Sequence, residues 1–358
     1  MASTAQTHDP LLSSVSQRLP NPGSRIIDVA RHGVSHFGRT LRVTVQLLSG
    51  LAVNYFLKVV EGDLGMLTCR GEYESLKEIS SFCDHVPEPY AWGRYMENNT
   101  EYSFLLVEFL QIQKQPAAPQ PLAKALATLH QTSRSPTGKF GFHTPTCHTR
   151  NIQSVAFWTD SWSELFTAHL SGILSTASNS TVFASPSFTQ LGNIILSTVT
   201  PALLDPLQSN GRTLKPCLVH GDCWDMNTAM ASDGRAVFFD VASFYAHNEY
   251  DVGNWRASRH GLSERSYIDA YKALVPPSEP VDDWDNRNLL YSLPFNLCNA
   301  LFVPGSTQRN QVFQDMRTQC ERVCSEKLHE LLHYSENHSG NETEGCSLNG
   351  NECNDLKG

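Results

Sequence analysis

The sequence predicts an α+β chain of two lobes, in which strands and one helix come first and a mostly helical part follows. Three observations support this. Apolar runs of strand length recur between positions 26 and 110, a proline-rich connector follows at 114–121, and apolar residues at helical spacing begin at Leu122. With 358 residues, of which 40% are hydrophobic, the chain is long enough to bury the cores of two lobes. We expect a flexible leader over residues 1–25, an N-lobe over 26–112, a C-lobe over 113–334 and a disordered tail over 335–358.

The composition of the chain indicates its cellular location and the classes of molecule that it binds. The net charge is -9, with 36 acidic against 27 basic residues and no basic block, so we expect neither nucleic acid nor membrane as a partner. The acidic balance suits a basic, amine-bearing substrate, although charge alone is explained more simply by solubility. The first 25 residues are polar and no stretch approaches the roughly 20 apolar residues of a membrane-spanning helix, which predicts a cytoplasmic protein. The ten cysteines are scattered, so we expect reduced thiols.

The N-lobe is predicted to begin with three strands. They cover residues 26–30, 41–48 and 54–60, where β-branched and aromatic residues are frequent. The loop between the first two strands contains Gly33, Ser35 and Gly38, small residues that would let backbone N–H groups approach a phosphate. An ordinary hairpin turn explains this loop equally well.

Lys58 interrupts the third strand, which would otherwise be buried. A lysine at such a position must find an anionic partner or point to solvent, because an unpaired buried charge is costly. Two carboxylates, Glu72 and Glu74, follow in the amphipathic helix predicted over residues 70–79. An edge-strand lysine and a solvated helix face would also explain the pattern.

Strand and helix signals continue beyond this helix. A turn into a strand is predicted over residues 86–93, and a buried central strand over 103–110. After the proline-rich connector, apolar residues at helical spacing predict a helix over 122–131, which marks the entry to the C-lobe. Later helices are predicted to begin near Thr159, to occupy both ends of 174–197 and to close the lobe over 312–332.

Two acidic side chains and an asparagine each follow a short apolar run. Asp222 and Asn227 come after the run that starts at Cys217, and Asp240 ends the run that starts at Ala236. Strand ends of this kind would bring oxygen ligands into one small volume. Phosphoryl transfer needs a carboxylate that takes the proton of the attacking hydroxyl, and hard oxygen ligands for Mg²⁺ on the nucleotide phosphates. Asp222 is therefore the predicted catalytic base, and Asn227 and Asp240 are the predicted metal ligands. Each of them alone would also fit an ordinary turn or strand end.

The same stretch resembles a known family. His220-Gly-Asp-Cys-Trp-Asp-Met-Asn227 and Phe239-Asp-Val-Ala-Ser-Phe-Tyr-Ala-His-Asn-Glu-Tyr-Asp251 are similar to the signature of the fructosamine and ribulosamine 3-kinases, a branch of the aminoglycoside phosphotransferase and choline kinase group. The sequences of Pro136-Thr-Gly-Lys-Phe-Gly-Phe142 and Trp158-Thr-Asp-Ser-Trp162 extend the resemblance to roughly residues 58–255. The chain departs from the family signature at four positions, Cys223, Met226, Val241 and Ala246.

The resemblance implies a bilobal protein-kinase-like fold that uses ATP and Mg²⁺, with an N-lobe antiparallel sheet plus helix and a mostly helical C-lobe. It implies that Lys58 contacts the ATP phosphates and that Glu72 holds Lys58 in place, with Glu74 as the rival for that role. The strand over 103–110 would run into the hinge between the lobes, where backbone groups of Glu108 and Leu110 could bind adenine.

Three residues beyond Asp240 have two possible roles each. In kinase-like folds an aspartate similar to Asp251 accepts backbone hydrogen bonds from the catalytic turn, although a simple charge at a helix N-terminus is the alternative. His247 and Glu249 either line the acceptor side of the cleft or form a structural pair.

The resemblance also implies the reaction. These kinases phosphorylate O3 of a ketoamine, and the unstable product releases the free amine, so the outcome is deglycation. The expected partner is a ketoamine-modified protein or a small amine or sugar substrate. The segment 289–302 matches the family loosely, since Asn296 and Asn299 are retained but Leu297 replaces a histidine, and this favours another amine-bearing metabolite as an alternative acceptor. A nucleotide-binding regulator without catalysis is a more distant alternative.

Overall fold

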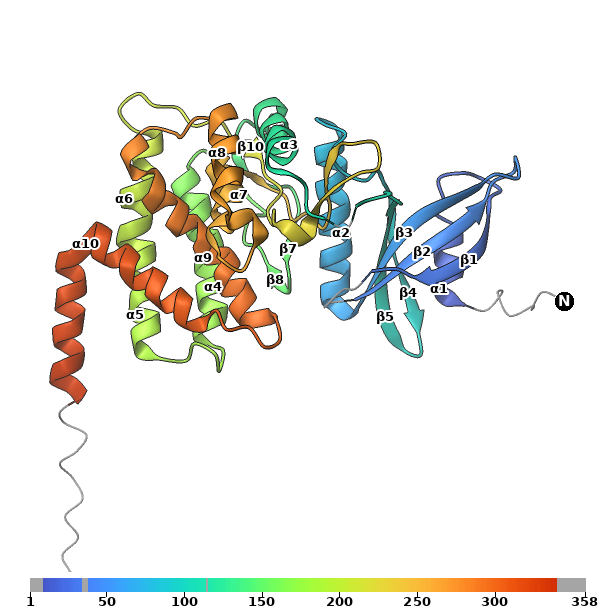
Figure 1. Ribbon diagram of the computed structural model, residues 1–358. Coiled ribbons are helices and arrows are strands. Elements are labelled where there is room, and N and C mark those ends of the chain that lie inside the picture. The colour runs from blue at the N-terminus through green and yellow to red at the C-terminus, as the bar shows by residue number, and fades with distance from the viewer. Residues whose placement is uncertain (1–8, 34–37, 114, 340–358) are drawn as a thin grey trace, which may run out of the picture.

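The computed structural model describes residues 9–33, 38–113 and 115–339. It has two lobes, a strand-rich N-lobe and a C-lobe built mainly of helices, and α2 (Gly62–Ser80) lies between the sheet and the C-lobe (Figure 1). This arrangement confirms the α+β class that the sequence predicts. Ser35 of the glycine-containing loop falls outside the described residues, as does Lys114 of the proline-rich connector.

The N-lobe sheet is antiparallel throughout, in the order β1-β2-β3-β5-β4. Its strands are β1 (Arg25–Arg31), β2 (Arg39–Gln46), β3 (Ala52–Glu61), β4 (Pro89–Glu97) and β5 (Thr100–Glu108). Side chains of β3 alternate between the two faces, because successive residues of a strand point in opposite directions. Leu57 and Val59 pack with one hydrophobic cluster, whereas Val60 packs with the cluster on the α2 side, and Lys58 alternates with them. The predicted strands are therefore present, and Lys58 lies in the centre of the sheet.

Helix α2 begins at Gly62, earlier than the residue 70 expected from the pattern. Its first turns contain glycines, which weaken the helical signal but have a structural reason. A Cβ at Gly65 would lie 2.5 Å from the Val60 carbonyl oxygen, and a Cβ at Gly71 would lie 2.9 Å from that of Pro145. These glycines let α2 pack closely against β3 on one side and against the C-lobe on the other.

The expectation of a flexible leader over residues 1–25 is wrong for its central part. Pro10–Ser16 form helix α1, which begins with Asp9 as the N-cap and a proline in the first turn. Leu11 and Val15 are buried against the face of the sheet that α2 leaves open. The helix forms because it covers this apolar face, a tertiary contact that local polarity does not reveal. Residues 1–8 lie outside the described part.

The C-lobe begins with α3, and its helices enclose a small four-stranded sheet of order β10-β13-β6-β9. Helix α3 starts at Pro119, so the last prolines of the connector occupy its first turn, where a missing N–H costs nothing. The helices are α3 (Pro119–Thr132), α4 (Trp162–Ser178), α5 (Pro186–Ile194), α6 (Thr200–Leu204), α7 (Glu249–Gly253), α8 (Arg265–Leu274), α9 (Trp284–Phe302) and α10 (Arg309–Ser339). The short strands are β6 (Phe140–Gly141), β7 (Cys147–His148), β8 (Asn151–Ile152), β9 (Trp158–Thr159), β10 (Cys217–Leu218), β11 (Thr228–Met230), β12 (Ala236–Phe238) and β13 (Tyr245–Ala246).

Helix α10 corrects the expected start of the disordered tail. It continues to Ser339 and bends at Cys324, whose φ of -149° and ψ of 53° are not helical (Figure 1). The first residues of the segment 335–358 are therefore helical, and residues 340–358 lie outside the described part. Among the described helices, none combines the length and the apolar character needed to cross a membrane.

Helix α2 is also hydrogen-bonded to the C-lobe. The Tyr245 hydroxyl donates to Glu78 Oε1 at 2.6 Å, and the backbone N–H of Ser243 donates to Ser75 Oγ at 3.1 Å. Directly after the helix, the Phe238 N–H donates to the His85 carbonyl at 2.7 Å. These bonds fix the position of α2, and with it the position of Glu72, relative to the C-lobe.

The burial of His169 in the C-lobe predicts a loss of stability in mild acid. Burial lowers the pKa of His169 to about 3, so the folded state keeps it neutral, whereas an unfolded histidine takes up a proton below about pH 6.5. Its contribution is complete above pH 6.5 and is lost as the pH falls towards 3, at about 1.4 kcal/mol per pH unit. Thermal unfolding followed between pH 7 and 4.5 should show a falling midpoint. His169→Gln, which does not titrate, should show a shallower fall, and identical slopes would contradict the assignment.

Candidate active site

Lys58 joins the two lobes through its ammonium group. Its Nζ lies 2.7 Å from Glu72 Oε2 on α2 and also contacts the Asp240 carboxylate, which belongs to the C-lobe. Lys58 and Glu72 are both largely buried, whereas the side chain of Asp240 is 53% exposed and opens towards solvent. Glu74, the rival for the pairing with Lys58, lies instead 3.4 Å from His143 on the surface. The structure thus brings Glu72 to Lys58, as the sequence predicts, and separates Glu74 from it.

This cluster holds one cation and two carboxylates. Burial opposes the charge of Lys58, but the carboxylates of Asp240 and Glu72 outweigh burial and raise its pKa above the ordinary value. Burial raises the pKa of Glu72 to about 7, against the opposing effect of Lys58. The pKa of Asp240 is pushed up by burial but is held below its usual value by Lys58. Because the carboxylates outnumber the ammonium group, the cluster favours an additional cation near the exposed side of Asp240.

The turn before Asp222 is held by Asp251. Its carboxylate accepts the backbone N–H groups of His220 and Gly221 at 2.7 and 2.9 Å, and His130 Nε2 lies 3.1 Å from it. Gly221 adopts a φ of 84°, and a Cβ there would lie 2.0 Å from the Ala242 carbonyl oxygen, so only glycine fits. The structure confirms the hydrogen-bonding role expected of Asp251, which fixes the direction of the following residue.

Three side chains hold the Asp222 carboxylate. Asn227 Nδ2 donates to Oδ2 at 3.0 Å, Asn254 Nδ2 donates to Oδ1 at 3.2 Å, and His148 Nε2 also lies 3.2 Å from Oδ1. Sequence reasoning missed His148 and Asn254, because neither belongs to a pattern that includes Asp222. In the structure His148 precedes Thr149, a β-branched residue in the left-handed region with a φ of 56°, a conformation that the sequence does not reveal.

His148 lies beside Asp222 in a position that favours its charged form. Burial disfavours the imidazolium, but the neighbouring carboxylate outweighs burial and raises the pKa of His148 well above its ordinary value. This shift favours the imidazolium form, in which Nε2 donates to Asp222. A carboxylate held by three donors keeps a fixed orientation, which is what a base needs in order to meet one particular hydroxyl.

Asn227 and Asp240 have the chemistry of magnesium ligands. Asn227 donates through its amide nitrogen to the backbone carbonyl and the carboxylate of Asp222, so its amide oxygen remains as a ligand atom. Asp240 has a φ of 57°, a conformation uncommon outside glycine that turns its carboxylate towards Lys58. Amide and carboxylate oxygens are hard donors that suit Mg²⁺, which usually takes one or two protein ligands and completes its shell with phosphate oxygens and water. The residues present therefore fit this ion.

The expected adenine contacts are only partly available. The backbone N–H of Glu108 donates to the Glu88 carbonyl at 2.8 Å, so Glu108 can offer adenine its carbonyl but not its N–H. Strand β5 ends at Glu108, and Leu110, just beyond it, packs against the hairpin of β11 and β12. Backbone contacts of Glu108 and Leu110 with adenine therefore stay a prediction, and at Glu108 it concerns the carbonyl group.

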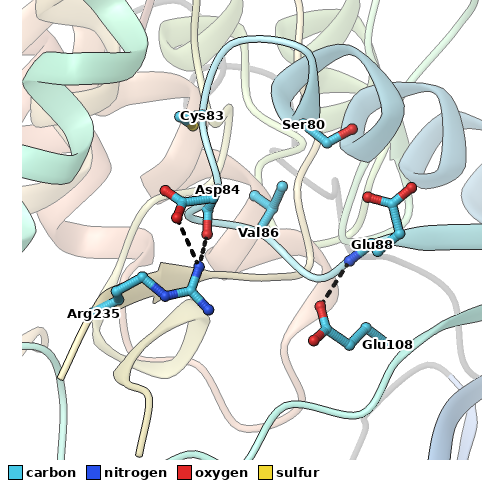
Figure 2. Close-up of a pocket in the computed structure, with 7 residues that line it drawn as sticks. All are labelled: Ser80, Cys83, Asp84, Val86, Glu88, Glu108 and Arg235. Atoms are coloured by element: carbon cyan, nitrogen blue, oxygen red, sulfur yellow. Dashed lines mark hydrogen bonds and ion pairs between the residues drawn. The ribbon is translucent and has the colours of Figure 1, made fainter. Parts of the chain in front are cut away.

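A hollow of about 370 Å³ lies beside this hinge (Figure 2). Its lining comes from the end of α2, from the segment leading into β4, from Glu108 and from Arg235, which contacts Asp84. The seven residues are Ser80, Cys83, Asp84, Val86, Glu88, Glu108 and Arg235. None of the predicted catalytic or metal-binding residues lines it, so this hollow is separate from the site of chemistry.

The structure decides between the two roles of His247 and Glu249. Glu249 forms a buried ion pair with Arg287, whose Nε lies 2.8 Å from Oε2. His247 contacts the hydroxyls of Tyr291 and Ser278, each at 2.9 Å. Both side chains are buried and bound to protein groups, so the structural alternative is correct and neither lines the acceptor side.

Three comparisons with known proteins agree with this geometry. The sequence profile of the fructosamine kinase family matches residues 40–319. A chloroplastic protein-ribulosamine 3-kinase of Oryza sativa subsp. indica is 28% identical over 280 residues, which span 78% of this chain and 76% of the rice protein. A probable ketoamine kinase of Enterococcus faecium is 27% identical over 263 residues, which span 73% of this chain and 85% of that protein.

Among solved structures, a putative fructosamine-3-kinase from Thermobifida fusca superimposes with a TM-score of 0.66 at 22% identity, covering 87% of this chain and 98% of that one. This likeness concerns the fold, and it confirms the bilobal kinase-like architecture that the resemblance implied.

Glu72 contacts Lys58 and Glu74 does not, so replacing each glutamate by glutamine should affect kcat/KM for ATP to different extents. Glu72→Gln removes the carboxylate that holds Lys58, and we expect kcat/KM for ATP to fall about 10- to 100-fold, as for the loss of a charged hydrogen bond. Glu74→Gln, the matched control, removes only a partly exposed pair with His143 and should change kcat/KM by less than about twofold. Steady-state kinetics with varied ATP would contradict the assignment if the two variants behaved alike.

Proposed function

The chain belongs to the fructosamine kinase family, and from this membership we propose that it transfers the γ-phosphoryl group of ATP to O3 of the sugar in a ketoamine. The proposed substrates are ribulosamine and fructosamine adducts of lysine. The observation that carries the proposal is the environment of Asp222, a carboxylate fixed by three donors and placed in the same chain turn as Asn227. Phosphorylation at O3 makes the adduct unstable, so the free amine is released and the protein acts in deglycation.

The chain's own residues divide the work of the transfer. Asp222 accepts the proton of the O3 hydroxyl while the new O–P bond forms and the bond between the γ-phosphorus and the bridging oxygen breaks, releasing ADP. Lys58 binds the nucleotide phosphates, and Glu72 keeps it in place when it exchanges Asp240 for a phosphate. Mg²⁺ held by Asn227 and Asp240 would neutralise charge on the phosphates. A fixed base and fixed charges lower the barrier because they need no rearrangement during the reaction.

Backbone groups supply the remaining nucleotide contacts in this proposal. The Glu108 carbonyl and the backbone of Leu110 face the adenine, and backbone N–H groups at Gly33 and Gly38 approach the phosphates. Gly38 also has a structural reason, since a Cβ there would lie 2.4 Å from the Val59 carbonyl oxygen. The cytoplasm is the proposed location, which suits buried thiols such as Cys69, Cys217 and Cys298 that form no disulfide.

The residue at position 297 of α9 favours a second class of acceptor, an amine-bearing metabolite other than a ketoamine. Leu297, at the position where the related family segment has a histidine, is fully buried and packs in the hydrophobic core. A polar group that could bind a sugar hydroxyl is therefore replaced by a core residue. Another amine-bearing metabolite on the same phosphotransfer site is the alternative to ketoamines.

The base assignment predicts the result of one conservative substitution. Asp222→Asn keeps the size of the side chain but cannot take up the proton, so kcat should fall about 10²- to 10⁴-fold while Mg-ATP binding persists. The measurement is ADP release with ribulosyl-lysine, fructosyl-lysine, an aminoglycoside and choline, together with calorimetry for ATP binding. Asp282→Asn, at an exposed position on the turn before α9, is the matched control.

Turnover of the ketoamines alone would support the proposal. Turnover confined to another acceptor would replace the ketoamine by that compound and keep the phosphotransfer mechanism. Full activity of Asp222→Asn would show that Asp222 is not the base.

A further inference from the structure

The region beside Asp222 contains buried polar atoms without hydrogen-bond partners. Within the described residues these include Asn254 Oδ1, Arg259 Nε and His260 Nε2. Buried polar groups are normally hydrogen-bonded, because each one left unsatisfied costs about 1–3 kcal/mol. Such a concentration next to the catalytic base indicates a place where a polar ligand binds.

Arg259 is the cation of this region. Its Nη1 donates to Asn296 Oδ1 at 2.6 Å and to Gln308 Oε1 at 3.2 Å, both neutral amide oxygens. No carboxylate of the described chain lies within 4.0 Å of its guanidinium nitrogens. Burial lowers the pKa of Arg259 to about 10, although Asp222 and Asp225 act in the opposite direction. The side chain is thus a partly buried charge whose hydrogen bonds go to uncharged groups.

Two other arginines of the same lobe have the carboxylate partner that Arg259 lacks among the described residues. Arg287, which is fully buried, is paired with Glu249 through both Nε and Nη2. Arg256 is paired with Asp285 at 2.7 Å. A desolvated guanidinium normally has such an anion, because the planar fork of donors matches a carboxylate. At Arg259 the Nε–H donor has no acceptor among the described residues, so it can donate to an anion from outside the chain.

Packing connects Arg259 to the reacting end of the cleft. Its neighbour His260 has Nδ1 3.3 Å from Asp225 Oδ1 and a ring centroid 4.9 Å from that of Trp224, two residues after the base. Its partner Asn296 follows Phe295, whose ring lies 5.5 Å from that of His148, the residue that contacts Asp222. Arg259 is thus linked through His260 and Asn296 to the side chains that surround Asp222.

We propose that Arg259 binds a carboxylate of the acceptor, so that the preferred substrates are ketoamines of free amino acids and not adducts on lysines within folded proteins. This inference rests on the proposed kinase function and narrows its substrate class. A free amino-acid adduct carries an α-carboxylate within reach of the sugar, whereas a lysine inside a chain has a neutral amide in its place. The nucleotide's own phosphate is the other possible source of an anion, and the kinetics separate the two.

The test compares two acceptors that differ only in this charge, ribulosyl-lysine and its methyl ester. We expect the unmodified protein to prefer the acid by about 10- to 100-fold in kcat/KM, the effect of one charged hydrogen-bonded pair. Arg259→Gln should lower this ratio to about one, because activity on the acid falls much more than activity on the ester. Arg259→Lys, which keeps the charge but loses the fork, should give an intermediate ratio, and it serves as the second variant should Arg259→Gln fold poorly.

Arg265→Gln is the matched control, since Arg265 is an exposed arginine paired only with Asp269 on the surface of α8. It should leave the ratio unchanged. A ratio near one in the unmodified protein would overturn the inference while leaving the kinase function intact. An equal loss on both acceptors with a raised KM for ATP would also overturn it and assign Arg259 to the nucleotide. Absence of turnover on both acceptors would overturn the proposed function itself.

Discussion

The pairing of Lys58 with two carboxylates is the interaction on which the rest of the structure depends. A lysine in the centre of a buried sheet is tolerated only when anions are placed beside it. Glu72 supplies one anion from α2 and Asp240 supplies the other from the C-lobe. The contact therefore requires strand β3, helix α2 and the chain after β12 to meet at one point. That point lies where the nucleotide phosphates bind in the proposed function.

The architecture around this contact keeps its parts in position. Glycines bring α2 close to β3 and to the C-lobe, and hydrogen bonds from Tyr245 and Ser243 tie the helix to the segment that follows Asp240. The same segment leads to Asp251, which holds the turn of the catalytic base. Helix α2 and the Asp222 turn are thus fixed to a common framework.

Local patterns predicted the parts of the site that follow strands. Asp222, Asn227 and Asp240 were recognisable because each comes directly after an apolar run, and Lys58 because it interrupts one. His148, Asn254 and Arg259 were not, because they come from separate segments and gain their meaning only from packing. Helix α1 was missed for a related reason, since seven residues in a polar stretch become helical by covering a sheet. Backbone pairing leaves no mark on sequence either, and so the occupied N–H of Glu108 could not be foreseen.

Phosphorus and carbon NMR of a mixture of the protein, Mg-ATP and ribulosyl-lysine tests the central claim most directly. The account predicts one new phosphomonoester signal coupled to C3 of the sugar, followed by its decay as free lysine appears. Formation of ADP and inorganic phosphate without a phosphomonoester signal at any time, or a phosphate on another atom of the acceptor, would contradict it.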